Sequence, residues 1–275
     1  MADMSNIKIA KTYETRALQN RGGPKITVDI IIPFHALADK MIAAVKSIFK
    51  HTRSPNYEIC LVDDCSPNAR LGDSFTKAPH TKYIRLDKQV GFGGAVDMGL
   101  KETNNPWVCI LHSDCEIMHP QWLTELLRCV NEHRKDKVIM VSARTDNPGD
   151  HVSPLLKANR GDVRDDVILE EGFLPMYCVL LHRQLFRALG SYIRAYPYAY
   201  YEDEELAARM RQKGLKQAIC GTSWVHHIGG ATINYLCKKQ SDPKYSGPDY
   251  KKIMEANYDR CLADISKLTQ PTEQS

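Results

Sequence analysis

Two clusters of carboxylates stand shortly after apolar runs of the sequence. Asp63 and Asp64 follow the run CLV, and Asp114 with Glu116 comes after the run VCIL. At the rim of a sheet, such carboxylates can accept hydrogen bonds from a nucleobase or ribose, or bind a hard divalent cation through oxygen. One isolated aspartate in such a place more often caps a turn or a helix. Two clusters at equivalent strand ends favour a binding site.

A glycine-rich segment, GFGG at residues 91–94, precedes a helical stretch that runs to Lys101. Glycine has no Cβ, so this backbone can lie close to a phosphate or to another segment of the chain. The residues favour neither interpretation over the other. A dinucleotide-binding fingerprint would have a third glycine where Val96 stands, which argues against an NAD site.

A run of four acidic residues, EDEE, begins at Glu202 directly after the aromatic segment YPYAYY. The helix macrodipole favours carboxylates at the start of a helix whether or not they have another role. Apolar ring surface beside one of these acids would raise its proton affinity toward that of a general base. Asp203 or Glu202 is therefore a candidate base.

Two adjacent histidines, His226 and His227, precede a pair of glycines in the segment HHIGG. A single histidine is more often a core or surface residue than a ligand. Two of them beside glycines suit a metal ion or a phosphate, and the carboxylates elsewhere in the chain could complete a metal site.

These motifs lie at the ends of predicted strands, because short apolar runs alternate with helical periodicity through residue 142. The predicted strands are residues 28–32, 57–62, 83–86, 107–111 and 138–141. The pattern predicts an α/β fold: a Rossmann-like, mostly parallel sheet with helices on both faces and ligands at the carboxyl ends of its strands. Residues 146–172 lose the periodicity and are predicted to form a long loop or lid.

Helices are expected in the remaining parts of the chain. Their predicted ranges are residues 37–49, the stretch to 101, 120–130 with Pro120 in the first turn, 203–212 and 250–268. The chain is divided into a basic N-terminal lead-in (1–25), one main domain (26–235) and a C-terminal helical extension (236–275).

The composition is that of an ordinary globular protein and excludes a disordered, collagen-like or coiled-coil chain. The 275 residues are 43% hydrophobic and 25% charged, with a net charge of +4. Dedicated nucleic-acid binders carry a more concentrated basic surface. No apolar stretch reaches about 18 residues and no signal peptide is recognised, so we expect neither a transmembrane segment nor secretion. Nine cysteines, an odd and scattered set, predict a reducing compartment and a cytoplasmic protein.

Several motifs in this order resemble the inverting family 2 glycosyltransferases of the GT-A fold, over about residues 28–232. IIPFHALADKMIAAVKSIFKHT with YEICLVDDCSPN resembles the opening strand, helix and strand of the family with its nucleotide-binding aspartates. RLDKQVGFGGAVDMGL resembles the loop and helix that face the nucleotide, and WVCILHSDCEIMHPQWL the strand with the DxD-type metal motif. YCVLLHRQLFRALGSY resembles the acceptor-side helix, YYEDEELAARMRQKG the ED motif of the catalytic base, and HHIGGAT the late metal motif.

The resemblance implies roles for individual residues. Asp203, with Glu202 beside it, would deprotonate the acceptor, and Asp114 and His227 would bind Mn²⁺ or Mg²⁺. Donor contacts would come from Pro33, Asp63, Asp64, Gly91, Gly93, Gly94, Ser113 and Asp114. Two positions depart from the family pattern: His112 replaces the first acid of DxD, and Gln89 replaces a common asparagine.

The resemblance implies a metal-dependent inverting glycosyltransferase that uses a nucleotide-diphosphate sugar, with UDP- and TDP-sugars the leading donors. The acceptor stays open among a glycan, a lipid-linked glycan, a protein and modified DNA. A catalytically silent binding module is one alternative, suggested by His112. A sugar nucleotidyltransferase is another, although PFHAL after the first strand differs from the glycine- and arginine-rich phosphate loop expected there.

Overall fold

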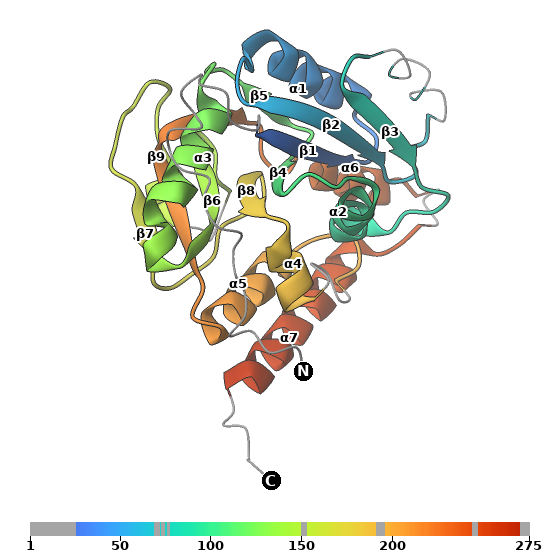
Figure 1. The fold of residues 1–275 in the computed structure, drawn as a ribbon. Coiled ribbons are helices and arrows are strands. Elements are labelled where there is room, and N and C mark those ends of the chain that lie inside the picture. Colours follow the sequence, from blue (N-terminus) through green and yellow to red (C-terminus); the bar gives the residue numbers. More distant parts are fainter. Residues whose placement is uncertain are drawn as a thin grey trace.

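The computed structural model describes residues 26–68, 72, 75, 78–149, 153–190, 196–243 and 247–269. The basic lead-in predicted for residues 1–25 therefore lies outside the described residues. Within them, nine strands form one sheet in the order β3-β2-β1-β4-β8-β6-β9-β5, with β7 paired to β9 (Figure 1). The strands are β1 (Thr27–Phe34), β2 (Asn56–Asp63), β3 (Thr81–Arg85), β4 (Trp107–Leu111), β5 (Cys115–Ile117), β6 (Val138–Thr145), β7 (Val167–Leu169), β8 (Cys178–His182) and β9 (Lys216–His227).

Helices cover this sheet. They are α1 (Ala38–His51), α2 (Gly91–Glu102), α3 (Trp122–Glu132), α4 (Gln184–Leu189), α5 (Glu202–Gln212), α6 (Ala231–Gln240) and α7 (Tyr250–Thr269), with short 3₁₀ turns η4 (His133–Asp136) and η5 (Pro154–Leu156). None of the helices in the described part of the chain is long and apolar enough to cross a membrane.

The first half of the sheet confirms the predicted α/β architecture and explains where a ligand can bind. Strands β3, β2, β1 and β4 are all parallel. The chain moves outward from β1 to β2 through α1 and returns from β3 to β4 through α2, so right-handed crossovers place α1 and α2 on opposite faces. β1 is apolar almost throughout because both of its faces are covered. The reversal of direction between β1 and β4 opens a crevice at their carboxyl ends.

The second half of the sheet is mixed. β8 runs antiparallel to β4 and β6, and β5 and β7 run antiparallel to β9. The sequence did not predict β8, since the segment that starts at Cys178 was expected to belong to a helix. That segment first adds a buried strand beside β4, and the helix α4 begins only at Gln184.

The expected loop at residues 146–172 is wrong in its last part, where β7 pairs with β9. Side chains from β6 and β9 donate hydrogen bonds to backbone carbonyls in the rest of the described loop. The indole nitrogen of Trp224 donates to the carbonyl of Ala158 at 2.9 Å, and a guanidinium nitrogen of Arg144 donates to that of Asp165 at 3.2 Å. The segment therefore packs over the end of β9.

The predicted helix at residues 120–130 begins two residues later than expected, at Trp122, so Pro120 precedes it. The helix expected at the C-terminal end is present as α7, which packs against α5 and α6. The boundary predicted at residue 235 falls inside α6. All nine cysteines are free, and seven of them are buried like small apolar side chains.

Candidate active site

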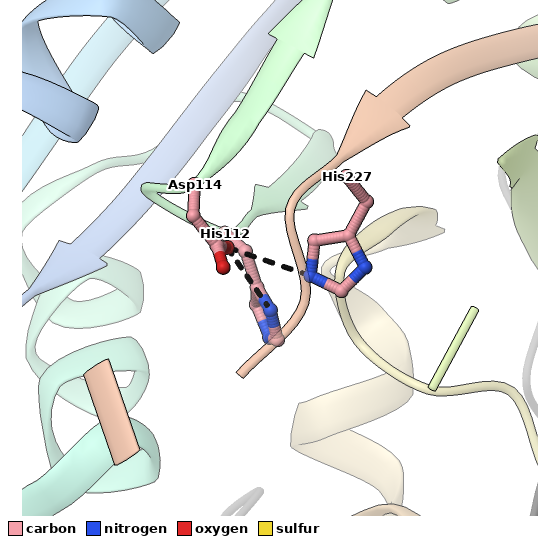
Figure 2. Close-up of side chains that lie close together, drawn as sticks. All are labelled: His112, Asp114 and His227. Atoms are coloured by element: carbon pink, nitrogen blue, oxygen red, sulfur yellow. Dashed lines mark ion pairs between the residues drawn. The ribbon is translucent and has the colours of Figure 1, made fainter. Parts of the chain in front are cut away.

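Three side chains from two distant parts of the sequence meet at the crevice. His112 and Asp114 lie in the turn after β4, and His227 ends β9. The antiparallel pairing of β5 with β9 places Cys115 opposite His227, which brings the two parts together. Figure 2 shows both histidine rings beside the Asp114 carboxylate, whose Oδ1 lies 3.9 Å from His112 Nδ1 and 3.4 Å from His227 Nε2. The three groups form a candidate site for a metal ion.

The His227 ring is oriented as a metal ligand would be. Its Nδ1 lies 2.7 Å from the carbonyl oxygen of Asn147, which can only accept, so Nδ1 carries the proton and Nε2 has the free electron pair. Nε2 is buried and has no hydrogen-bond partner. The ring also stacks on Tyr177 with centroids 5.0 Å apart. An outer hydrogen bond that fixes the tautomer is the usual arrangement of a metal-bound histidine.

Asp114 is ionised at this site. Burial alone would raise its pKa, but the neighbouring His227 and His112 and the hydrogen bond from the Ala231 amide hold the pKa well below its usual value. That amide, at the start of α6, donates to Asp114 Oδ2 at 3.2 Å, which leaves Oδ1 facing the histidines. A carboxylate oxygen suits Mn²⁺, and imidazole nitrogens are common ligands of divalent first-row metal ions, so the three groups can hold such an ion.

His112 completes the set, although the resemblance treated it as a departure. Burial, together with the proximity of His227, lowers the pKa of His112 to about 4, so its ring is neutral at pH 7 and can act as a ligand. The Phe92 ring packs edge-on against it at 5.0 Å, which connects the cluster to the glycine segment. The sequence contains a signal for this role: His112 stands two residues before Asp114, where the DxD motif has its first acid, and imidazole can replace carboxylate as a metal ligand.

Asp146 is a site residue that the sequence analysis missed. Its Oδ2 lies 2.6 Å from His226 Nδ1, and its Oδ1 accepts the backbone amide of His227 at 3.1 Å. The two adjacent histidines therefore have different partners, with His227 facing Asp114 and His226 paired to Asp146.

The two adjacent aspartates after β2 also differ in their contacts. Asp64 accepts the amides of Val90 and Gly91 at 2.7 and 2.8 Å, one on each carboxylate oxygen. Burial raises the pKa of Asp64 to about 6, and these two hydrogen bonds oppose the shift. Asp64 thus fixes the glycine segment against the carboxyl end of β2.

Asp63 is fully buried and is engaged by neighbours on β3. Its carboxylate accepts the Tyr83 hydroxyl at 2.5 Å, a guanidinium nitrogen of Arg85 at 2.6 Å and the Ser66 amide at 2.7 Å. These contacts tie β2, β3 and the following turn together.

The sequence left two interpretations of the glycine segment, a close approach to a phosphate or to another part of the chain. The structure shows a close approach to another part of the chain, at Tyr198. Gly91 has φ +85°, and a Cβ added there would lie 2.4 Å from the backbone nitrogen and Cα of Tyr198. Gly93 is buried in the first turn of α2, and a Cβ on Gly94 would meet the Val90 side chain at 2.7 Å. The segment is packed against the loop that precedes the acidic run.

Gly91→Ala is expected to lower the free energy of unfolding by about 2 to 5 kcal/mol, because the alanine adds left-handed strain to a backbone clash. Gly161→Ala is the matched control, since Gly161 has φ +89° and open space around its Cβ position. It should show only the backbone cost of about 1 to 2 kcal/mol. Urea denaturation of both variants measures the difference. An equal decrease in the free energy of unfolding in both variants would mean that the close approach of Gly91 to Tyr198 adds nothing to the cost of the alanine.

The acidic run begins α5, and its first two members differ in burial. Glu202 is 3% exposed and its Oε2 has no hydrogen-bond partner. Burial, and then the charge of Asp203, raises the pKa of Glu202 well above its usual value, which favours the protonated form of this carboxyl. Asp203 is half-buried and accepts the Met176 amide at 3.2 Å. The arrangement favours Asp203 over Glu202 as a base.

The other two residues predicted to contact the donor, Pro33 and Ser113, lie near the carboxyl ends of β1 and β4. Pro33 is opposite Val62 of β2, and Ser113 is buried and stands between His112 and Asp114 in the chain.

A second group of possible ligands, Cys129, Asp166 and Cys220, ties α3 to β9. Both carboxylate oxygens of Asp166 accept hydrogen bonds from the Arg128 guanidinium at 3.1 Å. The negative charge of Asp166 is therefore already balanced by Arg128.

Comparison with known proteins gives a family match and a curated relative for this chain. The model of the family described as "Glycosyl transferase family 2" matches residues 29–190, more than half of the chain. The chain is 24% identical over 230 residues to the O-antigen biosynthesis protein RfbC of Myxococcus xanthus. That match covers 75% of this chain but only 18% of the relative, so the chain spans about a fifth of the relative's length.

Solved structures confirm the expected GT-A fold. GalNAc-T7 with UDP, GalNAc and Mn²⁺ aligns with a TM-score of 0.62 at 20% identity, covering 86% of this chain and 48% of the other. The mannosyltransferase PcManGT from Pyrobaculum calidifontis, in complex with GDP-Man and Mn²⁺, aligns at 0.55 and 14% identity, covering 88% and 73%. S. aureus TarS with UDP-GlcNAc aligns at 0.54 and 12% identity, covering 86% and 73%.

Proposed function

The chain belongs to glycosyl transferase family 2, and from this premise we propose that it transfers a sugar from a nucleotide-diphosphate donor to an acceptor hydroxyl with inversion at the anomeric carbon. The observation that carries the proposal is the buried Nε2 of His227, which has no hydrogen-bond partner and lies 3.4 Å from Oδ1 of the ionised Asp114. An unpaired buried nitrogen is costly unless a ligand satisfies it. A divalent cation at the nucleotide diphosphate would do so.

Asp114, His227 and His112 would hold Mn²⁺ or Mg²⁺. When bound, such an ion neutralises charge on the departing diphosphate as a Lewis acid. Imidazole binds a metal ion in its neutral form, so the two histidines would add no charge of their own and the Asp114 carboxylate would be the anionic ligand.

Asp203 performs the proton transfer in this proposal. The acceptor oxygen forms its bond to the anomeric carbon while the bond from that carbon to the diphosphate oxygen breaks. The bonding pair leaves with the diphosphate, and the acceptor proton passes to the Asp203 carboxylate. Glu202 stays protonated, so it does not repel the negative charge of its neighbour. No covalent intermediate is required for inversion.

The glycine segment and Asp64 belong to the donor side. Asp64 holds Val90 and Gly91, and Phe92 touches His112, so the segment joins the nucleotide side of the crevice to the cluster. Pro33, Asp63, Gly93, Gly94 and Ser113 would support the same donor pocket. We propose a UDP- or TDP-sugar as donor; the similar structures hold UDP or GDP sugars. Nine free cysteines support a reducing, cytoplasmic setting.

A thermal-shift panel tests the proposal. We expect one of the UDP-, TDP-, GDP- and CMP-sugars to raise the melting temperature in Mn²⁺, with the rise lost in EDTA, because a ligand that binds only the folded state stabilises it. Transfer and donor hydrolysis are then assayed with that nucleotide sugar. The absence of a shift with every nucleotide, with and without metal, would contradict the donor site and favour a silent binding module.

A further inference from the structure

The loop that leads into the acidic run has an unusual backbone. Tyr198, Tyr200 and Tyr201 have φ values of +69°, +80° and +73°. At the first of these, the amide of Ala199 donates to the carbonyl of Pro197 at 3.0 Å, which closes a three-residue turn. A γ-turn with positive φ at its centre is rare and strained. Such backbone persists only where its surroundings hold it, and it gathers at functional sites.

Two elements hold this turn from different sides. The Tyr198 carbonyl accepts the Phe92 amide of the glycine segment at 2.5 Å. The carbonyls on either side of it, those of Pro197 and Ala199, accept the Asn257 side-chain amide at 3.0 and 2.9 Å. Asn257 is 2% exposed and projects from α7. A primary amide has two diverging hydrogens, so it can serve both carbonyls at once.

Further contacts between α7 and the loop fix their relative position. The Tyr198 ring packs edge-on against Tyr250 at 5.2 Å, and the Cys261 thiol donates to the Tyr201 carbonyl at 3.6 Å. Figure 1 shows α7 lying alongside α5, and α7 is beyond the residues matched by the family description. The glycine segment lies inside the matched residues, so the loop is held from one side by the matched region and from the other by α7, which lies beyond it.

The start of α5 depends on this support. Tyr201 is the N-cap residue of the helix, and its own side chain makes no capping hydrogen bond. The direction in which Asp203 projects is thus determined by the path of the loop before it. Since Tyr198 also contacts Gly91, the same turn connects the donor-side glycine segment to the base.

We propose that Asn257 is a positioning residue for transfer: its amide holds the strained turn at Tyr198 and thereby places Asp203 against the acceptor hydroxyl. This inference rests on the proposed function, in which Asp203 is the base. Misplacement of a catalytic group by about 1 Å can cost on the order of 100-fold in rate. Asn257→Asp keeps the shape of the side chain but removes both donors and sets a negative charge against two carbonyl oxygens.

The experiment compares Asn257→Asp and Asn257→Ala with Glu255→Gln, a conservative change at an exposed position on the same helix. We expect both Asn257 variants to lower kcat by about 10- to 100-fold. Donor KM should change less than about twofold, because the Asp64 contacts do not involve α7. Hydrogen exchange in residues 196–203 should become faster in both variants and stay unchanged in the control.

Two results would overturn the proposal. One is a kcat within about twofold of the unaltered protein in both Asn257 variants. The other is a parallel loss of kcat, donor binding and exchange protection across the whole sheet, which would show a merely structural role. If the unaltered protein neither transfers nor hydrolyses any donor while exchange at residues 196–203 still rises in Asn257→Asp, the proposed function fails. Asn257 would then support the loop without positioning a base.

Discussion

Asp203→Asn is expected to lower kcat by about 10²- to 10⁴-fold, the range that a positioned general base contributes. The amide matches the carboxylate in shape and can still accept the Met176 amide through its oxygen. It cannot take the acceptor proton at neutral pH, so the chemical step loses its base. Donor affinity should be retained, because the contacts assigned to the donor lie on other elements. Steady-state kinetics and titration of the donor onto the variant measure the two effects separately.

The neighbouring acids provide a matched comparison. Glu202→Gln replaces a carboxyl whose burial favours the neutral form, so we expect its kcat to stay within about tenfold of the unaltered value. Glu204→Gln changes a third acid in the same helical turn and controls for the lost charge near the N-terminus of α5. The assignment of the base would be wrong if Asp203→Asn kept more than about a tenth of kcat while Glu202→Gln lost its activity.

The parallel half of the sheet could be predicted because its signals are strong. β1 is apolar over most of its length and has a proline near its end, and β2 contains the apolar run ICLV followed directly by aspartates. β8 and β7 are different cases. CVLLH has a run of four apolar residues, and a helix begins two residues after its histidine; such short runs fit a strand and a helix equally well. β7 is three residues long within a polar segment, and only its pairing with β9 makes it a strand.

The sequence could predict which types of residue belong to the candidate site, but it could not predict which neighbours each of them contacts. Asp63 is the last residue of β2 and Asp64 follows it outside the strand, so the neighbours of each carboxylate decide which way it faces. Tyr83 and Arg85 engage Asp63, which leaves Asp64 for the glycine segment. His112 was undervalued because the comparison was made with a carboxylate motif.

Contacts across long sequence separations could not be predicted by local spacing. Asp146 meets His226 across 80 residues, and Asn257 meets Pro197 across 60. Neither pair shares an element whose periodicity would place its members together. The positive φ values at three tyrosines were equally hidden, since bulky residues rarely adopt them without tertiary support.

His227→Ala is expected to weaken Mn²⁺ binding in the presence of the nucleoside diphosphate by at least about 100-fold, since loss of an outer-shell partner alone costs about 10- to 100-fold. The variant removes the nitrogen whose electron pair faces Asp114. Calorimetric titration of Mn²⁺ measures the affinity, and the metal-dependent thermal shift with the donor should disappear together with it.

His226→Ala separates the roles of the two adjacent histidines. His226 contacts the Asp146 carboxylate and reaches the cluster only through it, because the other oxygen of that carboxylate accepts the His227 amide. Its loss should therefore cost no more than the 10- to 100-fold of an outer-shell partner, and less than the loss of His227. His80→Ala, on an exposed ring, controls for removal of an imidazole elsewhere. A larger loss of Mn²⁺ affinity at His226 than at His227 would move the ligand to the other side of β9 and contradict the cluster. The reverse order would identify His227 as the ligand, in agreement with the 2.7 Å contact that directs its Nδ1 to the Asn147 carbonyl and its Nε2 to Asp114.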